Sequence, residues 1–276
     1  MKNNKNNWKR YGALAAIVLI LVAFCLPMIF AFGTSEHSQA LFRGSLGAAL
    51  LAPVLIYAMM LVYRILNRTK KAGESEMENI IFDVGQVLVK FNWKEYLDSF
   101  GFSEEKTEKL ANAIFLSETW NERDRGTLRE EEYVNQMVQK LPEYEEDIRE
   151  IMRRSDETIV PTEYADTWIQ YLKNKGYHIY ILSNYSEETL RTTRKNKLTF
   201  LKYVDGAVFS CDVKQIKPEP EIYQTLLNRY KLDSKKSVFL DDRKENCEGA
   251  EKFGIHTILF TSFKQAAAEL EKLGIK

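Results

Sequence analysis

The sequence predicts an α/β protein in which helices cover both faces of a parallel sheet, preceded by two helices that cross a membrane. Over the C-terminal part of the chain, short β-branched or aromatic runs alternate with amphipathic stretches, a rhythm typical of parallel sheets. Two long uncharged stretches come before that part. The overall composition hides this division, because 276 residues with 45% hydrophobic content and zero formal net charge are also typical of a soluble globular protein.

The two uncharged stretches are residues 11–32 and 44–63. Each matches the roughly 20 residues that a helix needs to cross a bilayer. Lysine and arginine residues flank the outer ends of the pair, and such positive flanks stay in the cytoplasm. A cleaved signal peptide and a pair of buried core helices are the alternatives. The sequence therefore predicts a multi-pass plasma-membrane protein that contacts the lipid bilayer and keeps its C-terminal domain in the cytoplasm.

Cys25, Cys211 and Cys247 are expected to be reduced structural thiols, because disulfides are rare in the cytoplasm.

The predicted organisation of the chain has one inserted module, a helical cap within the α/β core. The predicted segments are a basic N-terminal segment (1–10), a first transmembrane helix (11–32), an external loop (33–43), a second transmembrane helix (44–66), a linker (67–77), the α/β core (78–91 and 156–276) and a helical cap (92–155).

The α/β core is predicted from short strand-like runs that helical patterns separate. These runs are Ile80–Asp83, His178–Leu182, Ala207–Ser210, Ser237–Leu240 and His256–Phe260, and the helices are expected from Ala165 to near Gly176, from Glu221 to Lys231 and from Lys244 to Phe253.

Residues 92–155 contain no clear strand but several helix starts. Ser103 is a predicted N-cap, and Thr127 with Glu130 forms a predicted capping box. A helical insertion directly after the first strand predicts a lid over the functional site, whereas the alternative is that these helices only extend the core.

Polar side chains follow several of the predicted strands. Asp83 comes directly after the first strand, where α/β sheets bind ligands. A carboxylate at this position can attack phosphorus or carbon, or hold a hard cation. Ser183 and Asn184 follow the second strand and could bind a phosphoryl oxygen, and Lys217 after the third could neutralise an oxyanion.

The fourth strand ends in Asp241 and Asp242, which add two more acids. Taken singly, each of these residues is more often structural, since an acid after a strand is commonly a helix N-cap. Their joint order along the chain indicates a functional site.

These motifs together resemble the four motifs of the haloacid dehalogenase superfamily. The matching residues are Asp83 with the following Gly85 and Leu88-Val89, then Ser183-Asn184, Lys217-Pro218, and Asp241-Asp242 with Asn246. The resemblance implies a Rossmann-like core, a helical cap between the first and second motifs, and Mg²⁺-dependent hydrolysis of phosphate monoesters. The membrane hairpin is outside the family pattern.

The resemblance also implies roles for these residues. Asp83 would be the nucleophile and a Mg²⁺ ligand, together with the backbone carbonyl of Gly85 and the side chain of Asp242. Asp241 would be a ligand or would orient one, and Ser183, Asn184 and Lys217 would bind the phosphoryl oxygens. The implied substrate is a small phosphorylated metabolite such as a sugar phosphate. Nucleic acid is not an expected partner, and the oligomeric state stays open.

Gly85 departs from the family pattern, because family phosphatases usually carry a second Asp at this position as general acid and base. General acid–base catalysis contributes about 10²–10⁴-fold, so we expect slow turnover or a substrate with a good leaving group. Glu122 and Asp124 of the predicted cap are candidate replacements.

Three functions follow from the sequence. The first is a membrane-tethered phosphatase. The second is a dehalogenase, which needs no cation and gives no role to the acid pair. The third is a weak or inactive binding module at the membrane.

Overall fold

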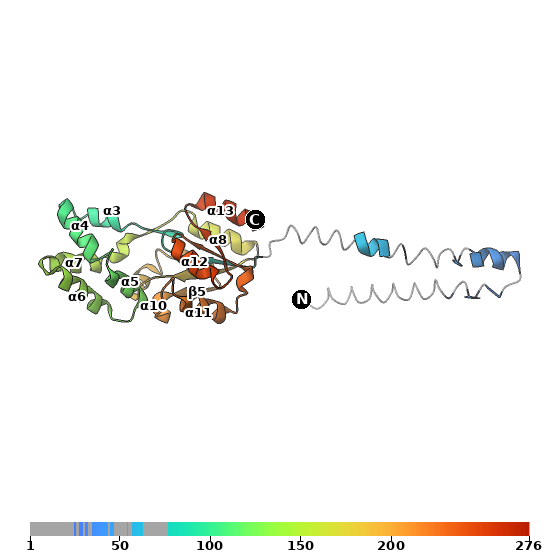
Figure 1. The fold of residues 1–276 in the computed structure, drawn as a ribbon. Coiled ribbons are helices and arrows are strands. Elements are labelled where there is room, and N and C mark those ends of the chain that lie inside the picture. Colours follow the sequence, from blue (N-terminus) through green and yellow to red (C-terminus); the bar gives the residue numbers. More distant parts are fainter. Residues whose placement is uncertain are drawn as a thin grey trace. The chain divides into compact units, whose positions relative to one another are not determined.

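The computed structural model describes residues 25, 28–29, 31–32, 35–43, 45–46, 54, 57–62 and 77–275. The chain divides into two compact units, Met1–Gly73 and Glu74–Lys276. Figure 1 shows that the second unit consists of a sheet with surrounding helices and, beside it, a separate group of helices that includes α3 (Trp93–Asp98), α4 (Glu104–Ala113), α6 (Glu130–Lys140) and α7 (Glu145–Arg153).

The predicted segments 1–10, 11–32, 44–66 and 67–77 lie wholly or largely outside the described residues. Within the described part of the chain, no helix combines the length and the apolar character that crossing a bilayer requires. Within the predicted external loop 33–43, residues 36–43 are helical. The Ser35 hydroxyl accepts a hydrogen bond from the backbone N–H of Ser38 at 3.2 Å, as an N-cap residue does.

The second unit contains a parallel sheet in the order β5-β4-β1-β6-β7. Its central strand is buried throughout, because neighbours pair with both edges and helices cover both faces. The predicted strands are confirmed to within a few residues. Their bounds are β1 (Asn79–Phe82), β4 (His178–Ser183), β5 (Gly206–Phe209), β6 (Ser237–Asp241) and β7 (His256–Leu259).

Two hydrophobic clusters pack against the sheet. One joins alternate residues of β1, β4 and β6 to α8 (Ala165–Asn174) and α13 (Phe263–Lys272), and Trp168 of α8 meets Phe82 edge-on at 4.9 Å between ring centroids. The other joins the opposite set of strand residues to α11 (Pro220–Tyr230) and α12 (Lys244–Glu251). The remaining helical segments of this core are α9 (Glu187–Thr193), η3 (Thr199–Tyr203), α10 (Ser210–Val213) and η4 (Ser234–Lys236).

The helical insertion consists of the elements between β2 (Val89–Phe91) and β3 (Ile159–Pro161), and it has a hydrophobic core of its own. Its elements are α3 (Trp93–Asp98), α4 (Glu104–Ala113), α5 (Glu118–Arg125), α6 (Glu130–Lys140), η1 (Pro142–Tyr144), α7 (Glu145–Arg153) and η2 (Ser155–Thr158). The sequence did not predict β2 or β3, which pair with each other as an antiparallel ribbon. The insertion therefore joins the core through two paired strands.

The predicted helix starts within the insertion have different outcomes. Ser103 caps α4 and accepts from the backbone N–H of Lys106 at 3.4 Å. The predicted capping box of Thr127 and Glu130 is wrong, because the N-cap of α6 is Arg129. The Glu132 carboxylate accepts from the Arg129 backbone N–H at 2.9 Å, so the reciprocal bond forms two residues later than expected.

Candidate active site

Asp83 lies at the C-terminal end of the central strand. Its backbone N–H donates to the carbonyl of Leu240 at 2.9 Å and so continues the pairing with β6. Its Oδ1 accepts from the backbone N–H of Val84 at 2.7 Å, which orients the carboxylate. The strand thus ends by presenting a buried acid at the edge where parallel sheets bind ligands.

Lys217 connects this acid to the end of the neighbouring strand. Its ammonium lies 2.9 Å from Asp83 Oδ1 and 2.6 Å from Asp241 Oδ2, and all three residues are buried. Burial by itself would lower the pKa of Lys217, but the charges of Asp241 and Asp83 raise it above its ordinary value. The site therefore contains a buried cation between two acids.

The pKa of Asp83 is raised. Burial is the main cause, Lys217 opposes it, and the charges of Asp241 and Asp242 raise the pKa further. The pKa of Asp242 is raised for the same reasons, burial first and then the charge of Asp241. Like charges so close together disfavour ionisation. A bound cation would offset this repulsion between the carboxylates.

Three carboxylates are close enough to share a metal ion. Asp83, Asp241 and Asp242 each offer an oxygen, and these oxygens lie within 4.8 Å of one another. An all-oxygen donor set of this kind suits Mg²⁺. Beside it, Oδ1 of Asn246 is buried without a hydrogen-bond partner among the described residues, a polar atom that a ligand or water could satisfy. The residues present thus fit a divalent cation.

Asp241 and Asp242 differ in their surroundings. Asp241 is fully buried and accepts hydrogen bonds from Lys217, from the side chain of Asn246 and from the backbone of Arg243. Asp242 lines the adjacent pocket.

Asn184 holds the backbone of Lys217. Its Nδ2 donates to the Lys217 carbonyl at 3.0 Å, and its Oδ1 accepts from the Lys217 N–H at 2.8 Å. This reciprocal pair makes Asn184 a positioning residue for the ammonium, in addition to the phosphate contact predicted from sequence. Ser183 precedes it, and the Ser183 Oγ is buried without a hydrogen-bond partner among the described residues.

A pocket of about 250 Å³ lies against these residues. The core side contributes Asp83, Gly85 and Asp242 to its lining, and the insertion contributes Trp120 and Phe115. Its remaining lining residues are Gln86, Phe91, Asn121, Arg123, Asp124, Thr158, Ile159, Asn184, Tyr185, Ser186, Thr189, Lys217, Arg243 and Asn246.

A profile of haloacid dehalogenase-like hydrolases matches residues 80–260, which covers the sheet, the insertion and every residue of this site. The chain belongs to this family.

Individual relatives of this haloacid dehalogenase-like hydrolase carry different activities. A sesquiterpene phosphatase of Aspergillus oryzae is 24% identical over 193 residues, which cover 70% of this chain and 94% of that protein. The (S)-2-haloacid dehalogenase 4A of Burkholderia cepacia is 33% identical over 91 residues, which cover 33% of this chain and 38% of that protein.

Solved structures share the fold. A family enzyme of Bacteroides thetaiotaomicron, in complex with magnesium and inorganic phosphate, aligns with a TM-score of 0.54 at 22% identity and covers 68% of this chain and 96% of that chain. The α/β core with its helical insertion is therefore an arrangement that this chain shares with solved structures.

The structure separates the two acids of the insertion that the sequence offered as candidates. Asp124 lines the pocket with Asp83 and Gly85. Glu122 does not, and its carboxylate pairs with Arg125 at 3.2 Å on a side chain that is 43% exposed.

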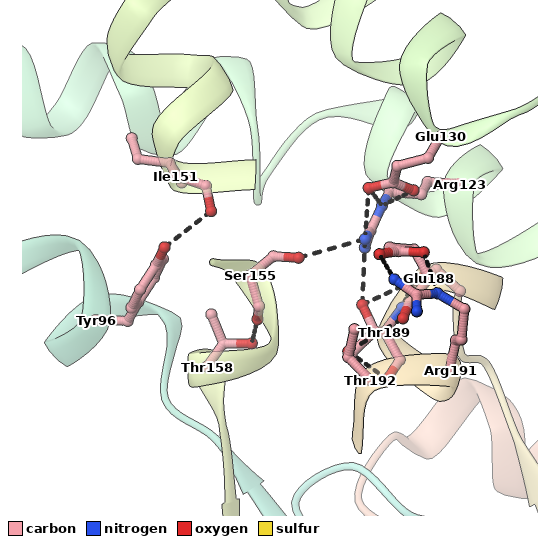
Figure 2. Close-up of polar contacts among 11 residues, drawn as sticks. Tyr96, Arg123, Glu130, Ile151, Ser155, Thr158, Glu188, Thr189, Arg191 and Thr192 are labelled. Carbon is pink, nitrogen blue, oxygen red and sulfur yellow. Dashed lines mark hydrogen bonds and ion pairs between the residues drawn. The ribbon is translucent and has the colours of Figure 1, made fainter. Parts of the chain in front are cut away.

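Sequence reasoning missed Arg123, a buried cation in the pocket wall of this haloacid dehalogenase-like hydrolase. Its side chain pairs with Glu130 at 2.7 Å and reaches Thr189 of the core at 3.1 Å, as Figure 2 shows. No sequence signal distinguished it from the neighbouring charged residues, because only the fold brings α9 to its side. Asn246 of the same pocket could be found from the sequence, because it follows the Asp241-Asp242 pair at the spacing of the fourth motif.

Proposed function

We propose that this chain is a Mg²⁺-dependent phosphatase that hydrolyses a small phosphate monoester through an aspartyl-phosphate on Asp83. The observation that carries the proposal is the buried Asp83–Lys217–Asp241 group with Asp242 beside it, next to a pocket large enough for a small metabolite. The phosphatase activity of the A. oryzae relative supports it.

The metal would be held by the side chains of Asp83 and Asp242 and by the backbone carbonyl of Gly85. When bound, Mg²⁺ would polarise a phosphoryl oxygen and offset the negative charge at the site. Asp241 already accepts hydrogen bonds on both of its oxygens. Its role is therefore to hold Lys217 and to add negative charge next to the cation.

The other residues bind the transferring group. Asp83 attacks phosphorus, and the Lys217 ammonium at 2.9 Å steadies the carboxylate and offsets charge on the phosphoryl oxygens. The free Ser183 hydroxyl donates to one of those oxygens. Asn184 keeps Lys217 in place through its backbone.

The pocket walls suit a leaving group with an apolar or flat face. Phe91 stacks on Trp120 at 5.7 Å between ring centroids, and Phe115 lies 4.9 Å from Trp120. Aromatic surfaces bind apolar groups, and Tyr or Trp binds ligands that also have polar edges. A sugar phosphate fits this description, as does a phosphate ester of a small apolar alcohol.

Dehalogenation is the second candidate, which the similarity to the B. cepacia enzyme favours. Displacement of a halide by a carboxylate needs no cation. The cluster of three carboxylates would then have no task, and its mutual repulsion would be a cost without a benefit. The phosphatase proposal accounts for these acids.

The phosphatase would be anchored in a membrane through residues 11–32 and 44–66, with its active site on the cytoplasmic side. The uncharged composition of both stretches supports this. So does the exposure of large apolar side chains in the first unit, since Met28, Phe32 and Met59 are 70%, 88% and 73% exposed. Carbonate extraction of cell membranes would recover the full chain in the pellet, and recovery in the supernatant would contradict anchoring.

The activity itself is tested with the purified full chain on p-nitrophenyl phosphate and a panel of phosphorylated metabolites, with Mg²⁺ and with EDTA. Wild type should hydrolyse at least one ester only with Mg²⁺. Asp83→Asn should lower turnover by about 10³-fold or more, as loss of a nucleophile does. Asp98→Asn changes an exposed acid of the insertion and should leave turnover unchanged. Mg²⁺-independent release of halide from 2-haloacids, without phosphatase activity, would favour the dehalogenase.

A further inference from the structure

We propose that Asp124, on the last turn of α5, is the general acid and base of this reaction and supplies the proton that Gly85 cannot. The inference rests on the proposed phosphatase function. It assigns to the helical insertion a direct part in the chemistry as well as in substrate selection.

The first argument is space. A Cβ built on Gly85 would meet nothing within 4 Å, so the position next to the nucleophile is open. Asp83, Gly85 and Asp124 line the same pocket. Among the residues that the structure describes, the Asp124 carboxylate takes part in no hydrogen bond or ion pair, which is unusual for a carboxylate in a partly buried position. Its oxygens are thus available to a substrate or a water molecule.

The second argument is that several contacts fix the backbone at Asp124 against the core. The Ser210 hydroxyl of α10 donates a short hydrogen bond to the Asp124 carbonyl. The next residue, Arg125, forms a bidentate pair with Glu219 at 2.7 Å for both bonds. Glu219 lies two residues after Lys217, so the pair ties α5 to the loop that carries the ammonium.

A glycine lets this end of α5 approach α10 closely. Gly126 has a left-handed backbone with φ of 73° and ends the helix. A Cβ at this position would lie 3.1 Å from both Cα and Cβ of Cys211, closer than such contacts normally are. The close approach packs the turn that carries Asp124 against α10.

Arg123 holds the other side of the same turn. Figure 2 shows its guanidinium between the insertion and the core. It pairs with Glu130 of α6 at 2.7 Å and donates to Thr189 of α9 at 3.1 Å and to Ser155 at 3.4 Å. Contacts before, at and after Asp124 therefore restrict where its carboxylate can lie, as a proton donor requires.

The surroundings of Asp124 also suit proton transfer near neutral pH. Burial raises the pKa of Asp124 to about 7, Arg123 opposes this, and the charges of Asp83 and Glu130 add to it. Arg243 also lowers the pKa. A carboxyl group that is partly protonated near neutrality can donate a proton and later accept one.

The chemistry proceeds in two balanced steps. An oxygen of Asp83 forms a bond to phosphorus, the bond to the leaving oxygen breaks, and the proton of Asp124 goes to that oxygen to give the free alcohol. Water then attacks phosphorus, Asp124 takes a proton from it, and the bond between phosphorus and Asp83 breaks with its electron pair returning to the Asp83 carboxylate. Inorganic phosphate leaves, and Asp124 is protonated again.

The test compares the full chain as wild type and as Asp124→Asn on phosphate esters with leaving groups of different basicity, from p-nitrophenyl phosphate to glycerol phosphate. The variant should lose about 10²–10⁴-fold on glycerol phosphate, the contribution of acid–base catalysis. It should still release about one equivalent of p-nitrophenol and then stall, because the second step lacks its base. The stalled phosphoenzyme should be detectable after acid quench and be absent from Asp83→Asn.

Glu122→Gln is the competing variant and Glu118→Gln the matched control, an exposed acid on the same helix. We expect neither to accumulate phosphoenzyme. If Asp124→Asn retains the wild-type dependence on the leaving group, or if Glu122→Gln stalls instead, Asp124 is not the acid. If wild type itself shows no hydrolysis that Asp83→Asn abolishes, the proposed phosphatase function is overturned as well.

A second variant guards against a change in fold. Asp124→Ala leaves space at the carboxylate, and added formate should restore its turnover on p-nitrophenyl phosphate by an order of magnitude while leaving Asp83→Ala inactive. No restoration by formate, in a variant that melts as wild type does, would count against the proposal.

Discussion

The Asp241 carboxylate accepts hydrogen bonds from Lys217, Asn246 and the backbone of Arg243, whereas the Asp124 carboxylate accepts none from the described residues. Asp241 is fully buried, whereas Asp124 is partly buried in the wall of the pocket. These partners fix the position of the Asp241 carboxylate between Lys217 and Asn246. Burial raises the pKa of Asp124 and so favours its protonated form, while the charges of Arg123 and Arg243 oppose this shift. The same type of side chain thus holds the Lys217 ammonium in one place and has a carboxylate without hydrogen-bond partners among the described residues in the other.

The raised pKa of Asp124 predicts how the stability of the protein depends on pH. The pKa of Asp124 is raised from 3.8 to about 7 in the folded protein, so the folded state binds this proton more tightly than the unfolded state. The resulting stabilisation is complete below about pH 4 and is lost as the pH rises through about 7. Without metal, Tm of wild type should therefore fall between pH 5 and 8 by several degrees more than Tm of Asp124→Asn.

Scanning calorimetry of both proteins in EDTA measures this difference. The other charged groups that face Asp124, namely Arg123, Asp83, Glu130 and Arg243, are present in both proteins. Parallel curves of Tm against pH would show that the Asp124 carboxyl titrates near its ordinary value.

At the level of elements, α5 is the helix on which the insertion and the core meet. Its last turn contacts α10 through Ser210 and Gly126, and its arginines reach Glu219 and Thr189. The paired strands β2 and β3 form the covalent connection, while α5 forms the docking contact. The insertion thus closes one wall of the pocket from a fixed position.

The docking contact can be tested at Gly126. Gly126→Ala should destabilise the protein in two ways, by placing a side chain at φ of 73° and by crowding Cys211 at 3.1 Å. Gly101→Ala is the matched control, because Gly101 has φ of 69° and open space around its Cβ. Both carry the backbone cost of about 1 kcal/mol, and Gly126→Ala adds about 1–3 kcal/mol for overpacking.

Urea denaturation gives both values, and turnover gives a second readout. Gly126→Ala should also lower turnover, because its crowding displaces the turn that carries Asp124, whereas Gly101→Ala should not. Equal losses of stability in the two variants would mean that α5 does not pack on α10 as closely as described.

For the molecule as a whole, the proposed Mg²⁺ site at the cluster of acids predicts that stability depends on a cation. A Mg²⁺ ion that binds the proposed site in the folded state and not in the unfolded one should add about 2.7 kcal/mol at a concentration of 100 times Kd. For a unit of this size that corresponds to a rise in Tm of about 5–10 °C.

Thermal melts of the full chain with Mg²⁺ and with EDTA test this expectation. Asp242→Asn removes a proposed ligand and should abolish most of the rise, while Glu248→Gln, an exposed acid of α12, should leave it intact. A rise of the same size in Asp242→Asn would place the cation elsewhere.

The fold of the α/β part and the acids at its strand ends could be predicted from the sequence, because both depend on local patterns. Short apolar runs separated by helical patterns identify the strands. Asp83, Lys217 and the Asp241-Asp242 pair each come after one of these runs. The short strands β2 and β3 could not be predicted, since each pairs only with a segment far away in the chain. Residues 11–32 and 44–66 stay a sequence-based prediction of membrane helices.

Only the tertiary structure decided which charged residues of the insertion reach the site. Glu122, Arg123, Asp124 and Arg125 are neighbours in one charged run, and nothing in their local pattern separates them. Successive positions of a helix point in different directions, and the surface that α5 docks against sends Asp124 to the pocket, Arg123 to Thr189, and Arg125 to Glu219. Docking of distant segments, which burial and pairing across the whole chain determine, therefore selects among residues that the sequence leaves equivalent.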